Sequence, residues 1–167
     1  MQFSINLTSL FVSTFLTGLT TGLCFTWANA VTPGIGRLND LGFLQAFQQM
    51  NRTIINPTFI VIFMGPFFVH LANVYLFRAT SSPLFWIIII AALLYIIGLV
   101  FVTLFGNVPL NELLDKVDLN QATPEELKSL RDQFENKWNR LHLIRTITTS
   151  ISFALLIVSI IIHSKNL

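Results

Sequence analysis

Charged residues are scarce in this chain. Of its 167 residues, 10 are Lys or Arg and 8 are Asp or Glu, so the charged fraction is 11%. A soluble domain contains about 25% charged residues, and the hydrophobic fraction of 53% and mean hydropathy of +0.69 point the same way. The composition therefore excludes an ordinary water-soluble globule and predicts a single membrane domain over residues 1–167.

Cysteine and histidine are also scarce. Cys24 is the only cysteine, which excludes an intramolecular disulfide, a CxxC redox pair and a cysteine-built zinc site. His142 has only His70 and His163 as companions, and no carboxylate lies in the apolar segments. We therefore predict no metal site and no cofactor. The net charge of +2 arises from one segment and two short loops, so it indicates no nucleic-acid partner.

Four long windows contain no charge, and they cover residues 1–36, 53–77, 79–111 and 146–164. A helix that rises 1.5 Å per residue needs roughly 20 apolar residues to cross a bilayer. The first window has no positive leader and is too long for a signal peptide, so it is interpreted as a retained span. The predicted fold is an all-α integral membrane antiparallel four-helix bundle, with spans near 7–31, 58–77, 84–106 and 143–163.

The distribution of basic residues predicts the orientation in the membrane. Two of them, Arg78 and Lys165, fall on the side that holds both termini, and the other eight fall on the side of the loops 32–57 and 107–145. By the positive-inside rule, the two long loops face the cytoplasm and the termini lie outside. The expected location is a multi-pass position in a bacterial inner membrane, with lipids as partners.

Two amphipathic segments lie on the predicted cytoplasmic side. Thr123, Pro124 and Glu126 form a capping box with proline at the first helical position, and no Gly or Pro follows from 125 to 167. This predicts one continuous helix over about 124–163, of which 124–142 extends into the cytoplasm. Its apolar stripe comprises Leu127, Leu130, Phe134, Trp138 and Leu141. The predicted partner is the amphipathic segment 41–54, whose stripe comprises Phe43, Phe47, Met50 and Ile54.

The spans offer different packing surfaces. Small residues at a spacing of four form one face of the first span, namely Thr14, Gly18, Gly22, Thr26 and Ala30. This face permits close packing inside the bundle, or a homodimer through Gly18 and Gly22. In the second span, Pro66 is expected to bend the helix, and His70 and Asn73 are either internal hydrogen-bonding residues or substrate contacts. The third span is expected to pack through Ala91, Tyr95 and Gly98.

Four short motifs occur at the span boundaries. They are WANAVTPG at 27–34, QMNRTIINPTF at 49–59, NVPLN at 107–111 and WNRLHLIRT at 138–146. In this order they resemble the anthrone-oxygenase-like family of small membrane proteins, and the resemblance covers about residues 22–152. Some fungal members are implicated in oxygenating anthrones to anthraquinones, whereas most bacterial members have no assigned reaction. The resemblance thus implies the fold strongly and an oxygenase function only faintly.

In an antiparallel bundle all four motifs meet at one membrane face, which is the predicted working end. His142 and Arg145 are the candidate catalytic residues, because an ionisable group near the bilayer is costly. Arg145 either snorkels to the headgroups or points inward to asparagines, a carbonyl or an anionic substrate. For a cofactor-free reaction with dioxygen, His142 could be the base, and Arg145, Asn29 and Asn51 could donate to the developing oxyanion.

The candidate substrate-binding residues are Trp27, Asn29, Asn51, Arg52, Asn107, Asn111 and Trp138. Alternatives remain for several of them. Asn51, Asn56 and Asn111 could cap helices, with Asn111 capping a short helix that begins at Glu112, and the tryptophans could form an interfacial belt. Two functions are compatible with this set: oxygenation of a flat hydrophobic phenol or quinol, or a non-catalytic membrane module that docks a partner protein or a lipid headgroup at Arg52 and Arg145.

Overall fold

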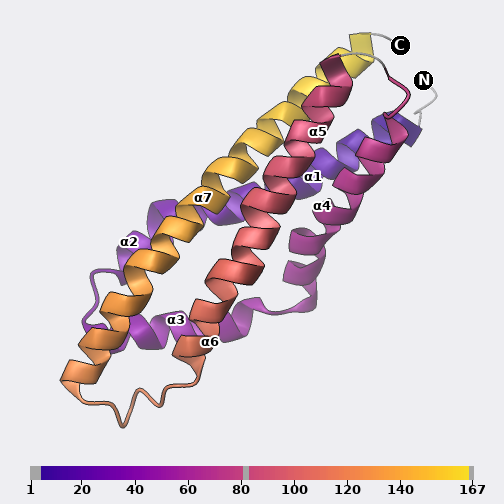
Figure 1. Ribbon diagram of the computed structural model, residues 1–167. Helices are drawn as coiled ribbons and strands as arrows, with labels where there is room; N and C mark the ends of the chain where they lie inside the picture. The colour runs from indigo at the N-terminus through magenta and orange to yellow at the C-terminus, as the bar shows by residue number, and fades with distance from the viewer. Residues whose placement is uncertain (1–4, 81–82, 166–167) are drawn as a thin grey trace.

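The computed structural model describes residues 5–80 and 83–165 (Figure 1). Regular structure in these two ranges is entirely helical, without any strand. Four continuous helical segments are long and apolar enough to cross a membrane: Ile5–Ile35, Pro57–Leu76, Pro83–Asp115 and Pro124–Lys165. The chain is therefore a multi-pass membrane protein, as its composition predicted.

The first long segment comprises α1 (Ile5–Thr26), a π-helical turn (Trp27–Val31) and α2 (Thr32–Ile35). The third comprises α5 (Pro83–Tyr95), two π-helical stretches (Ile96–Phe101 and Thr103–Asn107) and α6 (Val108–Asp115). Both continue beyond the predicted span ends at 31 and 106. Each passes a proline just after a π-helical turn, whose wider backbone lets the helix continue past the missing N–H.

Two helix starts follow the predicted capping chemistry. The Asn56 side chain accepts a hydrogen bond from the Phe59 N–H (3.0 Å) at the start of α4 (Pro57–Leu76). At the start of α7 (Pro124–Lys165), the Thr123 N–H donates to Glu126 Oε2 (2.8 Å), and the Glu126 N–H donates to Thr123 Oγ1 (3.3 Å). The predicted capping box and continuous last helix are confirmed. The predicted caps at Asn51 and Asn111 are wrong, because Asn51 lies inside α3 (Asp40–Ile54) and Asn111 lies inside α6.

The four long helices pack in a ring in which α1 and α5 each contact both α4 and α7 (Figure 1). The start of α1 and the end of α7 lie at one end of the molecule, here called the far end. The opposite end, here called the pocket end, holds α2, α6, the start of α7 and α3 (Asp40–Ile54). All four motifs therefore lie toward the pocket end.

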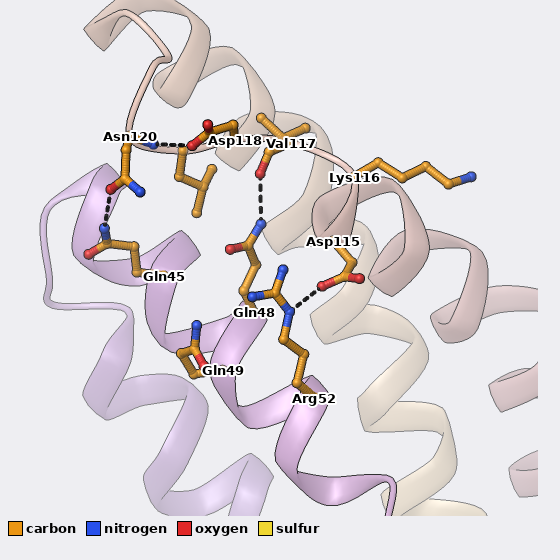
Figure 2. A pocket seen from close by; sticks show the side chains of 10 residues that line it. Gln45, Gln48, Gln49, Arg52, Asp115, Lys116, Val117, Asp118 and Asn120 are labelled. Carbon is orange, nitrogen blue, oxygen red and sulfur yellow. Dashed lines mark hydrogen bonds and ion pairs between the residues drawn. The ribbon is translucent and has the colours of Figure 1, made fainter.

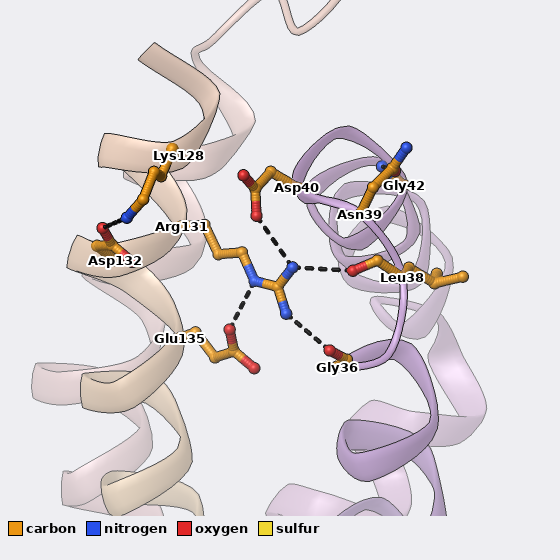
Figure 3. A network of polar contacts seen from close by, with 9 residues as sticks. All are labelled: Gly36, Leu38, Asn39, Asp40, Gly42, Lys128, Arg131, Asp132 and Glu135. Atoms are coloured by element: carbon orange, nitrogen blue, oxygen red, sulfur yellow. Dashed lines mark hydrogen bonds and ion pairs between the residues drawn. The ribbon is translucent and has the colours of Figure 1, made fainter. Parts of the chain in front are cut away.

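The pocket end is held together by the two amphipathic segments. The Phe47 ring of α3 lies 4.8 Å from the Phe134 ring and 4.9 Å from the Trp138 ring of α7, measured between centroids. Figure 3 shows Arg131 of α7 donating to the Asp40 carboxylate (3.0 Å), the Glu135 carboxylate (2.7 Å) and the main-chain carbonyls of 36 and 38. The predicted packing of segment 41–54 against the projecting part of the last helix is confirmed.

Glycines mark the closest approaches between helices. A Cβ atom placed on Gly98 would lie 2.5 Å from Thr148 Cβ, so the main chain of the third segment lies directly against the Thr148 side chain of α7. The predicted packing face of Ala91, Tyr95 and Gly98 is buried. A Cβ on Gly18 would lie 2.9 Å from the Phe153 ring, whereas one on Gly22 would meet nothing within 4 Å. Gly18 thus packs inside the molecule. A homodimer through the Gly18 and Gly22 face stays a prediction.

Candidate functional site

A cavity of about 340 Å³ opens at the pocket end. Seven of the nine predicted site residues line it: Trp27, Asn51, Arg52, Asn111, Trp138, His142 and Arg145. Apolar side chains complete the wall, namely Leu23, Ile54, Ile55, Phe59, Phe63 and Val108. The two tryptophans therefore belong to the wall of this pocket, and their ring centroids are 5.6 Å apart.

Asn29 and Asn107 do not line the pocket. Asn29 is exposed, because it lies two positions after Trp27 and so falls on nearly the opposite side of the helix. Asn107 is fully buried behind the pocket wall, where its Nδ2 donates to the Trp138 carbonyl (3.3 Å). Asn107 therefore supports the wall rather than contacting the cavity.

His142 is held at both ring nitrogens. Its ring stacks on Trp138, with centroids 4.9 Å apart and an interplanar angle of 21°. Nε2 lies 3.0 Å from the Cys24 carbonyl, which can only accept, so Nε2 carries the proton. Nδ1 lies 2.8 Å from Arg145 Nη2, which can only donate, so Nδ1 accepts. The geometry assigns a neutral imidazole with its proton on Nε2.

Arg145 points into the protein, and its 9% exposure rules out the snorkelling orientation. One guanidinium nitrogen donates to His142, another donates to Thr103 Oγ1 (3.2 Å), and the guanidinium carbon lies 5.2 Å from the Trp138 ring centroid. Its Nε has no hydrogen-bond partner, and the side chain forms no ion pair, among the residues that the structure describes. A buried cation without a counter-ion is costly. This site therefore favours a ligand that brings an anionic or hydrogen-bond-accepting oxygen.

The model of the anthrone oxygenase family matches residues 54–155, more than half of the chain. The chain belongs to the anthrone oxygenase family. The matched region contains His142, Arg145, Trp138 and Asn111, whereas Trp27 and Asn51 precede it. Neither a curated protein nor a solved structure matches the chain.

In this anthrone oxygenase family member, two further groups hold the Arg145 and His142 side chains in place. Thr103 accepts from Arg145, and the Cys24 main-chain carbonyl accepts from His142. Thr103 had a signal that sequence reasoning missed, because Thr103, Asn107 and Asn111 recur at a spacing of four in an apolar helix. The Cys24 carbonyl had none, since every residue carries the same main-chain group.

An ion pair lies between the pocket and a second, polar groove of about 510 Å³ (Figure 2). Arg52 Nε lies 2.6 Å from Asp115 Oδ1, and both side chains are about half exposed. Arg52, Asp115 and Lys116 line both the pocket and the groove. In the groove, Gln48 donates to the main-chain carbonyls of 114 and 117, which fastens α3 to the end of α6. Within the described residues, 5–80 and 83–165, no group of three His, Cys, Asp or Glu side chains is arranged to hold a metal ion.

Proposed function

We propose that the chain binds a flat hydrophobic phenol or quinol in the pocket and oxygenates it. The observation that carries the proposal is Arg145, a buried guanidinium that has no ion-pair partner among the described residues and lines a cavity walled by tryptophan and phenylalanine. Aromatic walls suit a planar ring system, and the guanidinium suits its oxygen. The cavity volume of about 340 Å³ falls in the range of small-molecule sites.

The proposed reaction needs no external reductant. An anthrone methylene is oxidised to a carbonyl by one dioxygen, with one oxygen atom retained in the anthraquinone and the other released as water. The substrate reacts once it is deprotonated, so the site needs a base and donors for the developing oxyanion. We assign the donor role to Arg145. His142 can accept a proton only at Nδ1, and this nitrogen becomes free when Arg145 turns from it to the oxygen of the ligand.

We further propose that the helices form an antiparallel bundle with the pocket end in the cytoplasm, because eight of the ten basic residues lie on that side. A hydrophobic ligand then enters from the bilayer, past the apolar wall of Ile54, Ile55 and Phe59. The Arg52–Asp115 ion pair closes the pocket toward water. Closing this side keeps water from the reactive intermediate.

The test uses the purified full chain in lipid nanodiscs, a hydroxylated anthrone, and measurement of oxygen uptake together with anthraquinone formation. We expect uptake above that of empty nanodiscs, and a loss of roughly 100-fold for Arg145→Gln and His142→Gln. Arg140→Gln is the matched control, because Arg140 is exposed on the same helix. Wild-type uptake no faster than empty nanodiscs would refute the oxygenase assignment. Ligand binding without turnover would support the non-catalytic membrane module instead.

A further inference from the structure

A second set of polar side chains meets between α1 and α4, within the membrane-spanning part. Ser13 and Thr17 of α1 and His70 and Asn73 of α4, here called the inner polar cluster, are all 0% exposed. None of the four lines the pocket. They are therefore not substrate contacts in that site, and a different role must explain four buried polar residues in an apolar environment.

The register between the two helices brings these residues together. Thr20 Oγ1 donates to the Ile62 carbonyl (2.8 Å), and Thr17 Oγ1 lies 3.3 Å from His70 Nε2. Thr17 precedes Thr20 in α1, whereas its contact His70 follows Ile62, the contact of Thr20, in α4. The two helices are therefore antiparallel here. One turn farther along each helix, Ser13 comes level with Asn73.

Hydrogen-bond accounting separates this cluster from its neighbours. Pro66 has no N–H to donate to the Ile62 carbonyl, and Thr20 Oγ1 donates to that carbonyl instead. The Tyr95 hydroxyl donates to the next carbonyl, that of Phe63 (2.7 Å). Inside the cluster, by contrast, four buried polar atoms lack a partner among the described residues: Ser13 Oγ, His70 Nδ1, Asn73 Nδ2 and Asn73 Oδ1. Buried polar atoms are nearly always paired, with protein or with ordered water.

We propose that the inner polar cluster is a site for ordered water molecules inside the membrane. The unpartnered atoms include both donors and acceptors and belong to side chains of two helices that meet at Thr17 and His70, so together they match a molecule that donates and accepts. The Asn73 amide donor and the absence of any carboxylate from these four side chains disfavour a metal ion. Bound water would also serve the bent part of α4, because ordered water can satisfy groups freed by a proline in a membrane helix.

The direction in which one substitution changes the Tm tests the proposal. Asn73→Leu removes two of the four unpartnered atoms at nearly constant volume. If the site is hydrated, the bound water loses partners and the Tm in nanodiscs falls by roughly 3 °C or more. If the site is dry, the substitution removes an unsatisfied amide and the Tm rises, which would overturn the proposal. Ser159→Ala is the matched control, because this equally buried hydroxyl already donates within its own helix to the Leu155 carbonyl (2.8 Å).

A second measurement on the wild-type chain does not depend on the folding of any variant. Brief X-ray radiolysis in ¹⁸O-labelled water generates hydroxyl radicals from bound water and oxidises adjacent side chains. We expect the rate of ¹⁸O incorporation into His70 to be within a few fold of the rate for a solvent-exposed histidine, although the His70 side chain is 0% exposed. Labelling at the background rate of buried apolar side chains would overturn the proposal. Neither readout involves an anthrone, so the result is independent of the proposed oxygenase function.

Discussion

Two buried histidines, each packed against an aromatic ring, have different surroundings. His142 lies 4.9 Å from Trp138 and borders the pocket, and His70 lies 5.0 Å from Tyr95 inside the inner polar cluster, measured between ring centroids. His142 has protein partners at both ring nitrogens, whereas His70 Nδ1 has none among the residues described. The contrast teaches that a histidine–aromatic pair does not by itself define a site. The neighbouring cation and the cavity distinguish the pocket from the cluster.

The largest expected effect separates the two regions by ligand binding. Arg145→Met keeps an unbranched side chain but removes the guanidinium and its charge, so we expect the affinity for a hydroxyanthraquinone to fall roughly 10- to 100-fold. Quenching of tryptophan fluorescence measures binding, since Trp27 and Trp138 line the pocket. Asn73→Leu is expected to leave this affinity unchanged. Equal losses in both variants would show that the two regions act as one site.

The next effect tests the packing between the third segment and α7. Gly98→Ala would place a Cβ atom 2.5 Å from Thr148 Cβ, so the helices must separate, and we expect a cost of about 1–3 kcal/mol in unfolding free energy. Unfolding in mild detergent, followed by circular dichroism, measures it. Gly22→Ala is the control, because its Cβ would meet nothing within 4 Å. A Gly98→Ala variant as stable as Gly22→Ala would show that this close approach is absent from the protein in solution.

A smaller effect is expected at the water-facing side of the pocket. Half-exposed ion pairs contribute at most about 1 kcal/mol, so we expect Asp115→Asn to raise the rate of modification of Cys24 by a water-soluble thiol reagent roughly fivefold. Cys24 is the only cysteine and lines the pocket, so the native chain carries its own reporter.

The matched control for this ion pair is Asp132→Asn, which breaks the exposed Lys128–Asp132 pair of the same 2.6 Å length. It is expected to leave the rate unchanged. If Asp115→Asn and Asp132→Asn label Cys24 at the same rate, the Arg52–Asp115 pair does not close the pocket.

The smallest effect is expected outside both histidine regions, at the start of α7. Thr123→Ala removes the hydroxyl that caps the helix, and we expect a loss of roughly 0.5–1 kcal/mol. The hydrogen bonds from Thr123 hold the pKa of the Glu126 carboxyl below its ordinary value. Their stabilisation is therefore present above the ordinary pKa and is lost as the pH falls through the lowered one. Thermal unfolding near neutral pH and in acid measures this, and a difference between wild type and variant that grows in acid would contradict it.

The sequence predicted those parts of the fold that depend on local patterns. Charge-free windows located the four membrane helices, and the apolar stripe that includes Phe134 and Trp138 identified the partner of segment 41–54. Continuation of the helices beyond Pro33 and Pro109 was not predictable from these patterns, because the π-helical turns before them depend on tertiary packing. The capping role given to Asn111 failed for this reason.

The candidate site was predictable in its composition and less so in its geometry. Convergence of the motifs on one end placed seven of nine residues around the pocket. Asn29 was misplaced because only the rotation of the helix after Trp27 decides which face it occupies. The proton position on His142 depends on the Cys24 carbonyl, which lies 118 residues away in the chain. Such a contact between distant main-chain and side-chain atoms leaves no trace in one sequence.

The central claim is that the pocket around Arg145 holds a planar aromatic ligand through its oxygen. The most direct measurement is an electron cryo-microscopy or crystal structure of the full chain in lipid, bound to a hydroxyanthraquinone. We predict planar density in the pocket, against the wall formed by Trp27 and Trp138, with a ligand oxygen at hydrogen-bonding distance from the Arg145 guanidinium. Ligand density elsewhere, with the pocket empty and Arg145 bound only to His142 and Thr103, would contradict the account.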